Sequence, residues 1–181
     1  MALAEKFSSL RFVVQLPAPD ASFDEYLASS SELLGPAKDR ITMQRKTTPG
    51  LQTVQDASVY LLRFTTLGSA PYSQLRTELK AHLPLLRIAP STTLIVAPPL
   101  LPEPGSVDPS VESLARLRDL FNLQLTNECE MELSELIAVI NSVNDESGRL
   151  VVANLLHFRT GATSAVCVKY EYNNDYFGNM P

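Results

Sequence analysis

Cysteine and histidine are scarce in this sequence, which has two of each among 181 residues. Cys129 and Cys167 form no CxxC motif, and the histidines, His82 and His157, form no metal-ligand spacing with them. A structural zinc site needs four such ligands at characteristic spacings, and a disulfide framework needs several paired thiols. We therefore expect neither a metal site nor a structural disulfide.

Clusters of positive charge and long apolar runs are missing too. The 15 lysines and arginines are scattered among 20 acidic residues, and the net charge is -5. A nucleic-acid-binding surface would need basic residues gathered on one face. No apolar run approaches the roughly 20 residues of a membrane span, and the N-terminus lacks the basic flank and apolar core of a signal peptide. We expect a cytoplasmic protein that binds neither nucleic acid nor membrane.

Buried strands are what the sequence does have. The run VYLL at 59–62 is β-branched, aromatic and aliphatic without polar alternation. This pattern predicts a strand buried on both faces, as inner strands of a parallel sheet are. The run leads into a Gly-Ser-Ala-Pro loop at 68–71. Ligands of open α/β sheets collect at the carboxyl ends of the strands, so we expect a functional site between residues 63 and 72.

Strand and helix patterns alternate along the chain until two final strands, which form a hairpin. This order predicts an α/β fold with a mostly parallel sheet and a C-terminal antiparallel hairpin, in one domain over 1–172 with a polar tail at 173–181. A Pro-rich loop is expected at 100–108, and Asn127 or Glu128 is expected to start the last helix. The predicted strands are 10–15, 40–44, 59–62, 92–97, 150–156 and 164–172, and the predicted helices 22–34, 72–86, 111–125 and 132–143.

Five segments occur in an order and at a spacing that point to a known family. They are LRFVVQ, DASVYLLRF, LLPEPG, ARLRDLFNLQLTNECEMELSEL and the terminal hairpin. Together they resemble the C-terminal half of fungal small-molecule O-methyltransferases that use S-adenosylmethionine, over residues 2–172. The resemblance implies a Rossmann-like, methyltransferase-type sheet.

The same resemblance implies that methyl transfer has been lost. The family's glycine-rich cofactor loop has no counterpart, and Leu16 stands where the family has an Asp that accepts the ribose hydroxyls. Leu67 stands where the family has its catalytic His, so general-base catalysis, worth about 10²–10⁴-fold, is absent there. Pro98 replaces the acid that orients this His. We therefore expect no cofactor.

The resemblance also implies that the family's first strand is missing. In the family sheet that strand lies between LRFVVQ and DASVYLLRF, and its loss would leave backbone groups of both neighbours unpaired. Either these two strands pair directly or another polypeptide completes the sheet. A homodimer or a partner-completed sheet is expected.

One hypothesis is a repurposed enzyme. The vacated cleft would bind a fungal polyketide-type metabolite and catalyse its cyclisation, dehydration or a pericyclic step, which requires shape and a few polar groups. Glu130 matches a supporting acid of the family, although a first-turn helix acid explains it equally well. The candidate catalytic residues are Glu130, His157 and Arg63, and the candidate substrate-binding residues are Phe64, Leu67, Tyr72, Asn122 and Asn127.

The alternative is a non-catalytic pseudo-methyltransferase subunit that pairs with a full-length enzyme or with itself. A fragment of a longer methyltransferase is a third possibility, but Leu16 and Leu67 argue against a fragment of an active one. A closed apolar pocket with convergent polar groups near Leu67 would support the enzyme. A large exposed apolar face would support the subunit.

Overall fold

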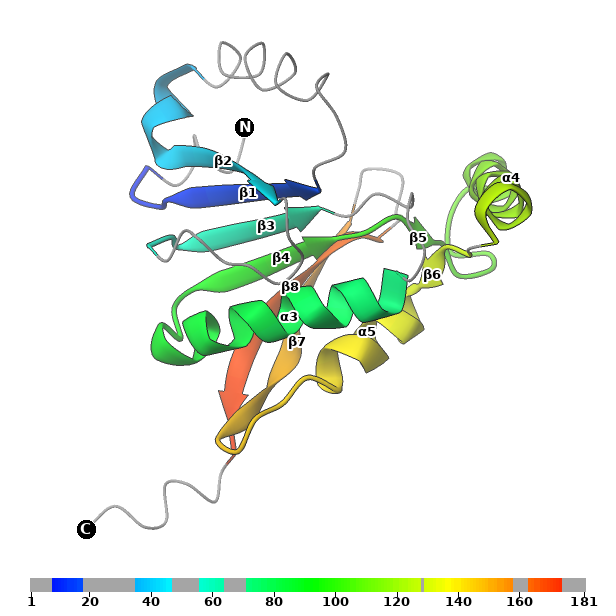
Figure 1. Cartoon of the computed structure of the whole chain (residues 1–181). Coiled ribbons are helices and arrows are strands. Elements are labelled where there is room, and N and C mark those ends of the chain that lie inside the picture. Colours follow the sequence, from blue (N-terminus) through cyan, green and yellow to red (C-terminus); the bar gives the residue numbers. More distant parts are fainter. Residues whose placement is uncertain are drawn as a thin grey trace.

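In the computed structural model the described residues are 8–17, 35–46, 56–63, 71–127, 129–157 and 163–173. The predicted helix at 22–34 lies outside them, as does nearly all of the predicted tail. Figure 1 shows one twisted sheet with helices α3 (Pro71–Ile88) and α5 (Leu133–Asn141) packed in front of it. Helix α4 (Pro109–Thr126) stands apart at one side.

The main sheet has six strands in the order β2-β1-β3-β4-β8-β7. Strands β1 to β4 run parallel, whereas β8 pairs antiparallel with β4 and with β7. This confirms the predicted mostly parallel sheet with its C-terminal antiparallel hairpin. The strands are β1 (Phe12–Pro17), β2 (Ile41–Lys46), β3 (Val59–Arg63), β4 (Thr93–Ala97), β7 (Gly148–His157) and β8 (Thr163–Tyr172).

Strands β1 and β3 pair with each other directly. Their parallel register runs from Phe12 opposite Val59 to Gln15 opposite Leu62. The facing backbone groups of β1 and β3 are therefore satisfied by each other. Of the two alternatives, direct pairing is the one the structure shows, and no second polypeptide is needed between these strands.

Two short elements and one helix start differ from the expectations. Residues 35–40 form a 3-10 helix (Gly35–Arg40). The segment 100–108 is not entirely loop, because β5 (Leu100–Leu101) pairs in parallel with β6 (Met131–Glu132). Helix α5 starts after Glu132, not at Asn127 or Glu128, and the Glu135 carboxylate accepts a hydrogen bond of 2.9 Å from the Glu132 N–H. This is half of a capping box, in which a side chain satisfies an open backbone donor at the helix start.

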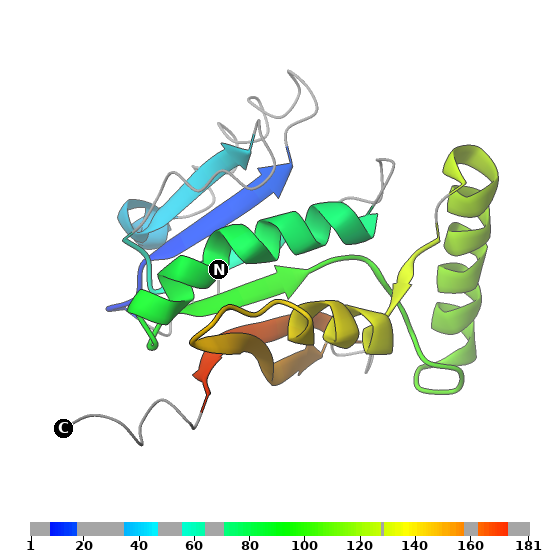
Figure 2. The same ribbon diagram turned by 60° about the horizontal axis from the view of Figure 1, so that its bottom comes forward.

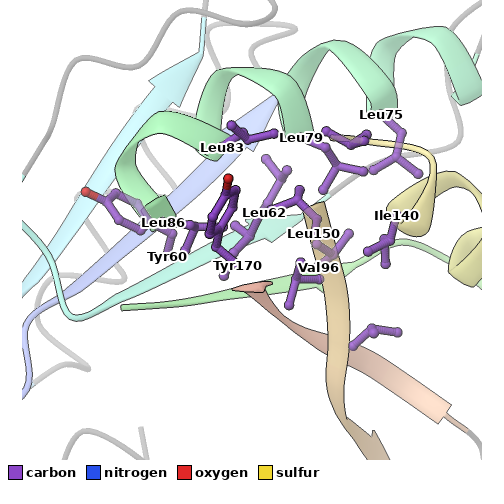
Figure 3. Packing of buried hydrophobic residues seen from close by; sticks show 14 of the residues in the cluster. Tyr60, Leu62, Leu75, Leu79, Leu83, Leu86, Val96, Ile140, Leu150 and Tyr170 are labelled. Atoms are coloured by element: carbon purple, nitrogen blue, oxygen red, sulfur yellow. The ribbon is translucent and has the colours of Figure 1, made fainter. Parts of the chain in front are cut away.

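The core lies between the sheet and the inner sides of α3 and α5. Leucines recur along α3 at the helical period and all face the sheet, as Figure 3 shows. They pack onto alternate residues of β3, where Tyr60 and Leu62 are buried and Leu61, pointing to the other face, is half-buried. Each fully buried leucine contributes about 1.5–3 kcal/mol. The four leucines are Leu75, Leu79, Leu83 and Leu86.

Strand β7 forms one edge of the described sheet, and its pairing with β8 is irregular. The register shifts between Val152 and Asn154, and again between Leu156 and His157. Such shifts mark β-bulges, which bend a strand and increase its twist.

Asp145 joins three parts of the fold at the amino end of the sheet. Its carboxylate accepts hydrogen bonds from the Tyr170 hydroxyl (2.6 Å) and from the backbone N–H groups of Ser147 and Gly148, and it pairs with Arg87 at the end of α3. Burial alone would raise the pKa of Asp145, but these donors and the Arg87 charge outweigh it and lower the pKa. Burial, and then the Asp145 contact, raise the pKa of Tyr170 to about 12.

Acid should therefore weaken the fold through Asp145. A carboxyl group whose pKa is lower in the folded than in the unfolded state stabilises the fold above its unfolded pKa, and this contribution is lost as the pH falls through its folded pKa. We expect stability to fall below pH 3.8, the unfolded value. Asp145→Asn should cost about 1–3 kcal/mol at pH 7 and flatten this part of the profile. Urea unfolding from pH 2 to 7 measures both, with the exposed neighbour variant Glu146→Gln as control. An Asp145→Asn profile that falls as steeply as the wild type would contradict the assignment.

Candidate functional site

The carboxyl edge of the sheet holds two of the predicted catalytic residues, but far apart. Arg63 ends β3, and His157 ends β7 at the same edge, because β7 and β4 are both antiparallel to β8. The two residues are separated by three strand-to-strand steps, from β3 through β4 and β8 to β7. At about 4.8 Å a step, this is roughly 14 Å. Both residues are exposed, so they form no buried catalytic pair.

Three predicted substrate-binding residues lie wholly or partly outside the described part of the chain. Phe64 and Leu67 lie outside the described residues. Tyr72 lies in the first turn of α3, but its side chain is outside the described part. The role in substrate binding that was predicted for these three residues therefore stays a prediction.

Glu130 lies beyond the carboxyl edge, immediately before β6, and its side chain is fully buried. Arg118 of α4 holds it with two hydrogen bonds, one from Nε to Oε1 and one from Nη2 to Oε2 at 2.6 Å. Asn122, one helical turn further on, donates to Oε1 at 3.2 Å. Asp119 accepts the Glu130 backbone N–H at 2.6 Å. We call these four residues the Glu130 cluster.

The Glu130 cluster is an anchor for α4. A two-point guanidinium–carboxylate pair is among the strongest polar contacts in proteins and fixes the geometry of both partners. The carboxylate raises the pKa of Arg118, mainly through the hydrogen bond, against the opposing effect of burial. Both oxygens of Glu130 are engaged within the protein, so the carboxylate is poorly placed to take a proton from a substrate.

Asn122 and Asn127, both predicted to face a substrate, have structural contacts. Asn122 belongs to the Glu130 cluster. Asn127 caps the C-terminus of α4 in the left-handed conformation, with φ of 57°, and its N–H donates to the Leu123 carbonyl at 3.0 Å. Asparagine tolerates this conformation better than most residues, which explains its place at the helix end.

Sequence reasoning missed Arg118 and Asp119. Arg118 and Asn122 are four residues apart and Asp119 lies between them, so all three occupy one side of a helix. That spacing was a usable signal, because a buried acid such as Glu130 needs donors of this kind. The spacing of the leucines in the same segment predicted the helix correctly. It did not indicate that the polar side of this helix would face the protein.

Helix α4 has polar residues on the side that faces the protein and apolar residues on the side that faces solvent, the opposite of an ordinary amphipathic helix. Its inner side, toward the protein, carries Ala115 together with the polar Asp119 and Asn122, all buried or half-buried. Figure 2 shows α4 standing away from the sheet, attached through the β5–β6 side. Large apolar residues cover much of its solvent side, with 41% to 81% of each exposed. They are Leu114, Leu117, Leu120, Phe121, Leu123 and Leu125.

An exposed apolar face is the feature that favours an interaction protein over an enzyme with a closed pocket. Within the described ranges, no three His, Cys, Asp or Glu side chains are grouped to hold a metal ion. Cys129 and Cys167 are both free thiols. No helix in the described part of the chain is long and apolar enough to cross a membrane.

Comparisons with curated proteins point to transcriptional regulators, although no family model matches the chain. A transcriptional coactivator of Pseudocercospora fijiensis is 44% identical over 94% of this chain and 47% of its own length. The pestheic acid cluster transcriptional regulator 1 of Pestalotiopsis fici is 37% identical over 96% of this chain and 47% of its own. The cladofulvin cluster transcriptional coactivator of Passalora fulva is 37% identical over 96% and 41%. The chain thus spans about half the length of the curated relatives it matches.

Solved structures confirm the methyltransferase-type fold. A mitomycin 7-O-methyltransferase superposes with a TM-score of 0.62 at 20% identity, covering 94% of this chain and 44% of that one. A pericyclic reaction enzyme superposes with a TM-score of 0.61 at 16% identity, covering 95% and 39%. The chain is therefore structurally similar to the C-terminal catalytic domain of O-methyltransferases. At these identities the likeness shows the fold alone.

The hypothesis of a cyclase, pericyclase or dehydratase is wrong. The curated relatives that match most of this chain are named as transcriptional coactivators or regulators, and their names describe no catalyst. The absence of a cofactor stays a prediction. Strands β1 and β3 are hydrogen-bonded neighbours, so no strand carrying a glycine-rich loop lies between them.

Proposed function

We propose that this chain is a non-enzymatic regulatory module that contributes to transcriptional control of a fungal secondary-metabolite gene cluster. The observation that carries the proposal is the 44% identity, over 94% of this chain, to a protein named as a transcriptional coactivator. Several further relatives are named for metabolite clusters, among them those of notoamide and ergochrome. The proposal agrees with the alternative hypothesis that the chain is non-catalytic. It differs in the partner, which is a protein of transcriptional control and not a full-length methyltransferase.

Protein surfaces are the proposed partners, in place of a small-molecule metabolite. The net charge of -5 and the scattered basic residues argue against direct binding to DNA. The exposed apolar side of α4 is of the kind that proteins use for one another. A coactivator works on transcription, so the proposal adds the nucleus to the expected cytoplasmic location.

Deleting the gene in its native fungus should test this role. We expect transcripts of the metabolite cluster that it controls to fall severalfold, and the metabolite to fall with them. Wild-type chain should restore both, and so should Arg63→Ala and His157→Ala, which alter the predicted catalytic residues. Quantitative reverse-transcription PCR and metabolite profiling on the same cultures give the readout. An enzyme would instead lose the metabolite while transcripts stayed unchanged, and that result would refute the proposal.

Calorimetric titration with S-adenosylmethionine is the matching control in vitro. We expect no heat of binding, because the sheet leaves no place for the cofactor loop between β1 and β3. Binding at micromolar affinity would bring methyl-transfer chemistry back and count against a purely regulatory role.

A further inference from the structure

The solvent side of α4 follows the pattern of a helix that pairs with another helix. Residues one turn apart project to the same side of a helix, so apolar residues spaced by three and four form a continuous seam. Leu114, Leu117 and Phe121 have this spacing, and Leu120 and Leu125 flank them. All five are at least 49% exposed. We call these five residues the outer stripe of α4.

We infer that two copies of this chain pair through the outer stripes of their α4 helices, side by side and parallel, about a two-fold axis along the helices. The helix itself supports this inference, which does not depend on the regulatory role proposed above. In heptad terms, Leu114 and Phe121 take a positions and Leu117 takes a d position, as in the seam of a two-stranded coiled coil.

The positions that flank the seam match each other in a parallel pair. In that arrangement, each g position lies beside the e position five residues further along the partner helix. Ser113 takes a g position, and the residue five further on is Arg118. Leu120 takes the next g position, and Leu125 lies five residues after it. A parallel pair therefore places a polar residue beside a polar one and an apolar residue beside an apolar one, on both sides of the seam.

The charge of Arg118 also favours the parallel orientation. An antiparallel pair centred on the outer stripe would bring the two copies of Arg118 together near its middle, where like charges repel. A parallel pair places them on opposite sides of the seam, each beside Ser113 of the other copy. Arg118 uses two of its five N–H groups on Glu130, so it has donors left for that hydroxyl.

The placement of α4 leaves room for the second copy. At 100° per residue, the outer stripe is centred roughly 140° around the helix from Ala115, Asp119 and Asn122, which face the protein. Two paired helices would therefore hold the two sheets on opposite sides of the axis. Figures 1 and 2 both show α4 projecting beyond the sheet, with no other described helix or strand on its far side.

The area of the stripe sets the expected strength of the dimer. Its five side chains expose on the order of 500 Å² per copy, so the interface would bury about 1,000 Å² in total. Interfaces of this size lie at the lower limit for specific association. We expect a reversible dimer with a Kd on the order of 10 μM.

Light scattering coupled to gel filtration, between 5 and 200 μM, tests the dimer. The mass should rise from 19.9 kDa toward twice that value as concentration increases. Leu117→Asp should raise the Kd about a hundredfold, because the symmetric interface places two charges against an apolar seam. Leu123→Asp is the matched control, since Leu123 is 41% exposed on the same helix but lies outside the stripe. A monomer at 200 μM, or a dimer that Leu117→Asp leaves intact, would overturn the inference.

Cysteine crosslinking tests the orientation. In a Cys129→Ser background, Leu117→Cys should give a disulfide-linked dimer on mild oxidation, because the two copies of a d position meet in a parallel pair. Leu123→Cys should give none. A dimer with an antiparallel or unrelated interface would not crosslink at position 117, and would refute the parallel arrangement.

Charge changes at Ser113 test the register. Ser113→Glu should lower the Kd severalfold, because the new carboxylate lies beside Arg118 of the second copy. Ser113→Arg should raise the Kd severalfold through repulsion from the same residue. Light scattering at low and at high salt measures both, and salt should shrink the difference between the two variants. Equal Kd values for Ser113→Glu and Ser113→Arg at low salt would contradict the proposed pairing.

Discussion

Arg118→Ala should destabilise the protein by about 3 kcal/mol or more, and more than removal of its partner does. Removing one member of a buried ion pair costs about 3–5 kcal/mol when the remaining charge stays buried. The Glu130 side chain is fully buried, so Arg118→Ala leaves a carboxylate with the Asn122 amide as its one side-chain donor among the described residues. Glu130→Ala leaves a guanidinium that is 53% exposed, and water can solvate it. We expect the latter to cost about 1–3 kcal/mol.

A double-mutant cycle distinguishes this anchor from a general packing effect. The variant with both residues changed to alanine should be about as stable as Glu130→Ala alone, because the unpaired carboxylate is gone. Urea unfolding gives the free energies, and amide exchange along α4 shows whether the helix detaches first. Glu103→Ala, an exposed acid of the preceding loop, is the control. Equal losses for Arg118→Ala and Glu130→Ala would show that Glu130 is not buried as described.

Gly148→Ala should be equally damaging for a steric reason. A Cβ at this position would lie 2.1 Å from the Glu171 carbonyl oxygen and 2.8 Å from the Tyr170 ring. The first of these atoms is backbone of the neighbouring strand and cannot rotate away. To make room, β7 and β8 must separate where the Tyr170 hydroxyl bonds Asp145. We expect a loss of about 3 kcal/mol, at the upper end for an overpacked site.

Comparison of Gly105→Ala with Gly148→Ala distinguishes the cost of backbone strain from the cost of steric crowding. Gly105 has a φ of 74°, and nothing lies within 4 Å of an added Cβ. Alanine there should cost only the left-handed backbone penalty of about 1–2 kcal/mol. Thermal unfolding of both variants measures the contrast. Similar losses at the two positions would show that the contact with Glu171 is relieved at little cost.

The inner strands β3 and β4 could be predicted because their sequences are almost continuously apolar. Apart from the two threonines that begin the run at 92–97, the runs at 59–62 and 92–97 are apolar or aromatic, which is typical of buried strands. Both form strands whose ends lie within one residue of the predicted bounds. The pairing of β1 with β3 could not be chosen from sequence, since either alternative satisfies the same backbone groups. The β5–β6 pair is two residues a strand and is too short for any period to be visible.

The site was harder to predict, because sequence period does not say which side of a helix faces the protein. The leucines of α3 and those of α4 repeat in the same way, yet Leu79 is fully buried and Leu114 is 69% exposed. The polar side of α4 faces the protein because Arg118 and Asn122 bind the buried carboxylate of Glu130, which lies twelve residues after Arg118 in the sequence. The changes at Leu16 and Leu67 that the resemblance implies are compatible with a change of reaction, whereas the curated relatives are named as transcriptional coactivators.

The bulge in β7 has a consequence for how the protein behaves at high concentration. An edge strand of ten residues is long enough to recruit a strand from another molecule, which is how sheets grow into fibrils. The register shift at Val152 and Asn154 breaks the repeat that an incoming strand would have to match. Concentrated solutions should therefore contain discrete species, and thioflavin-positive fibres should be absent while the fold is intact.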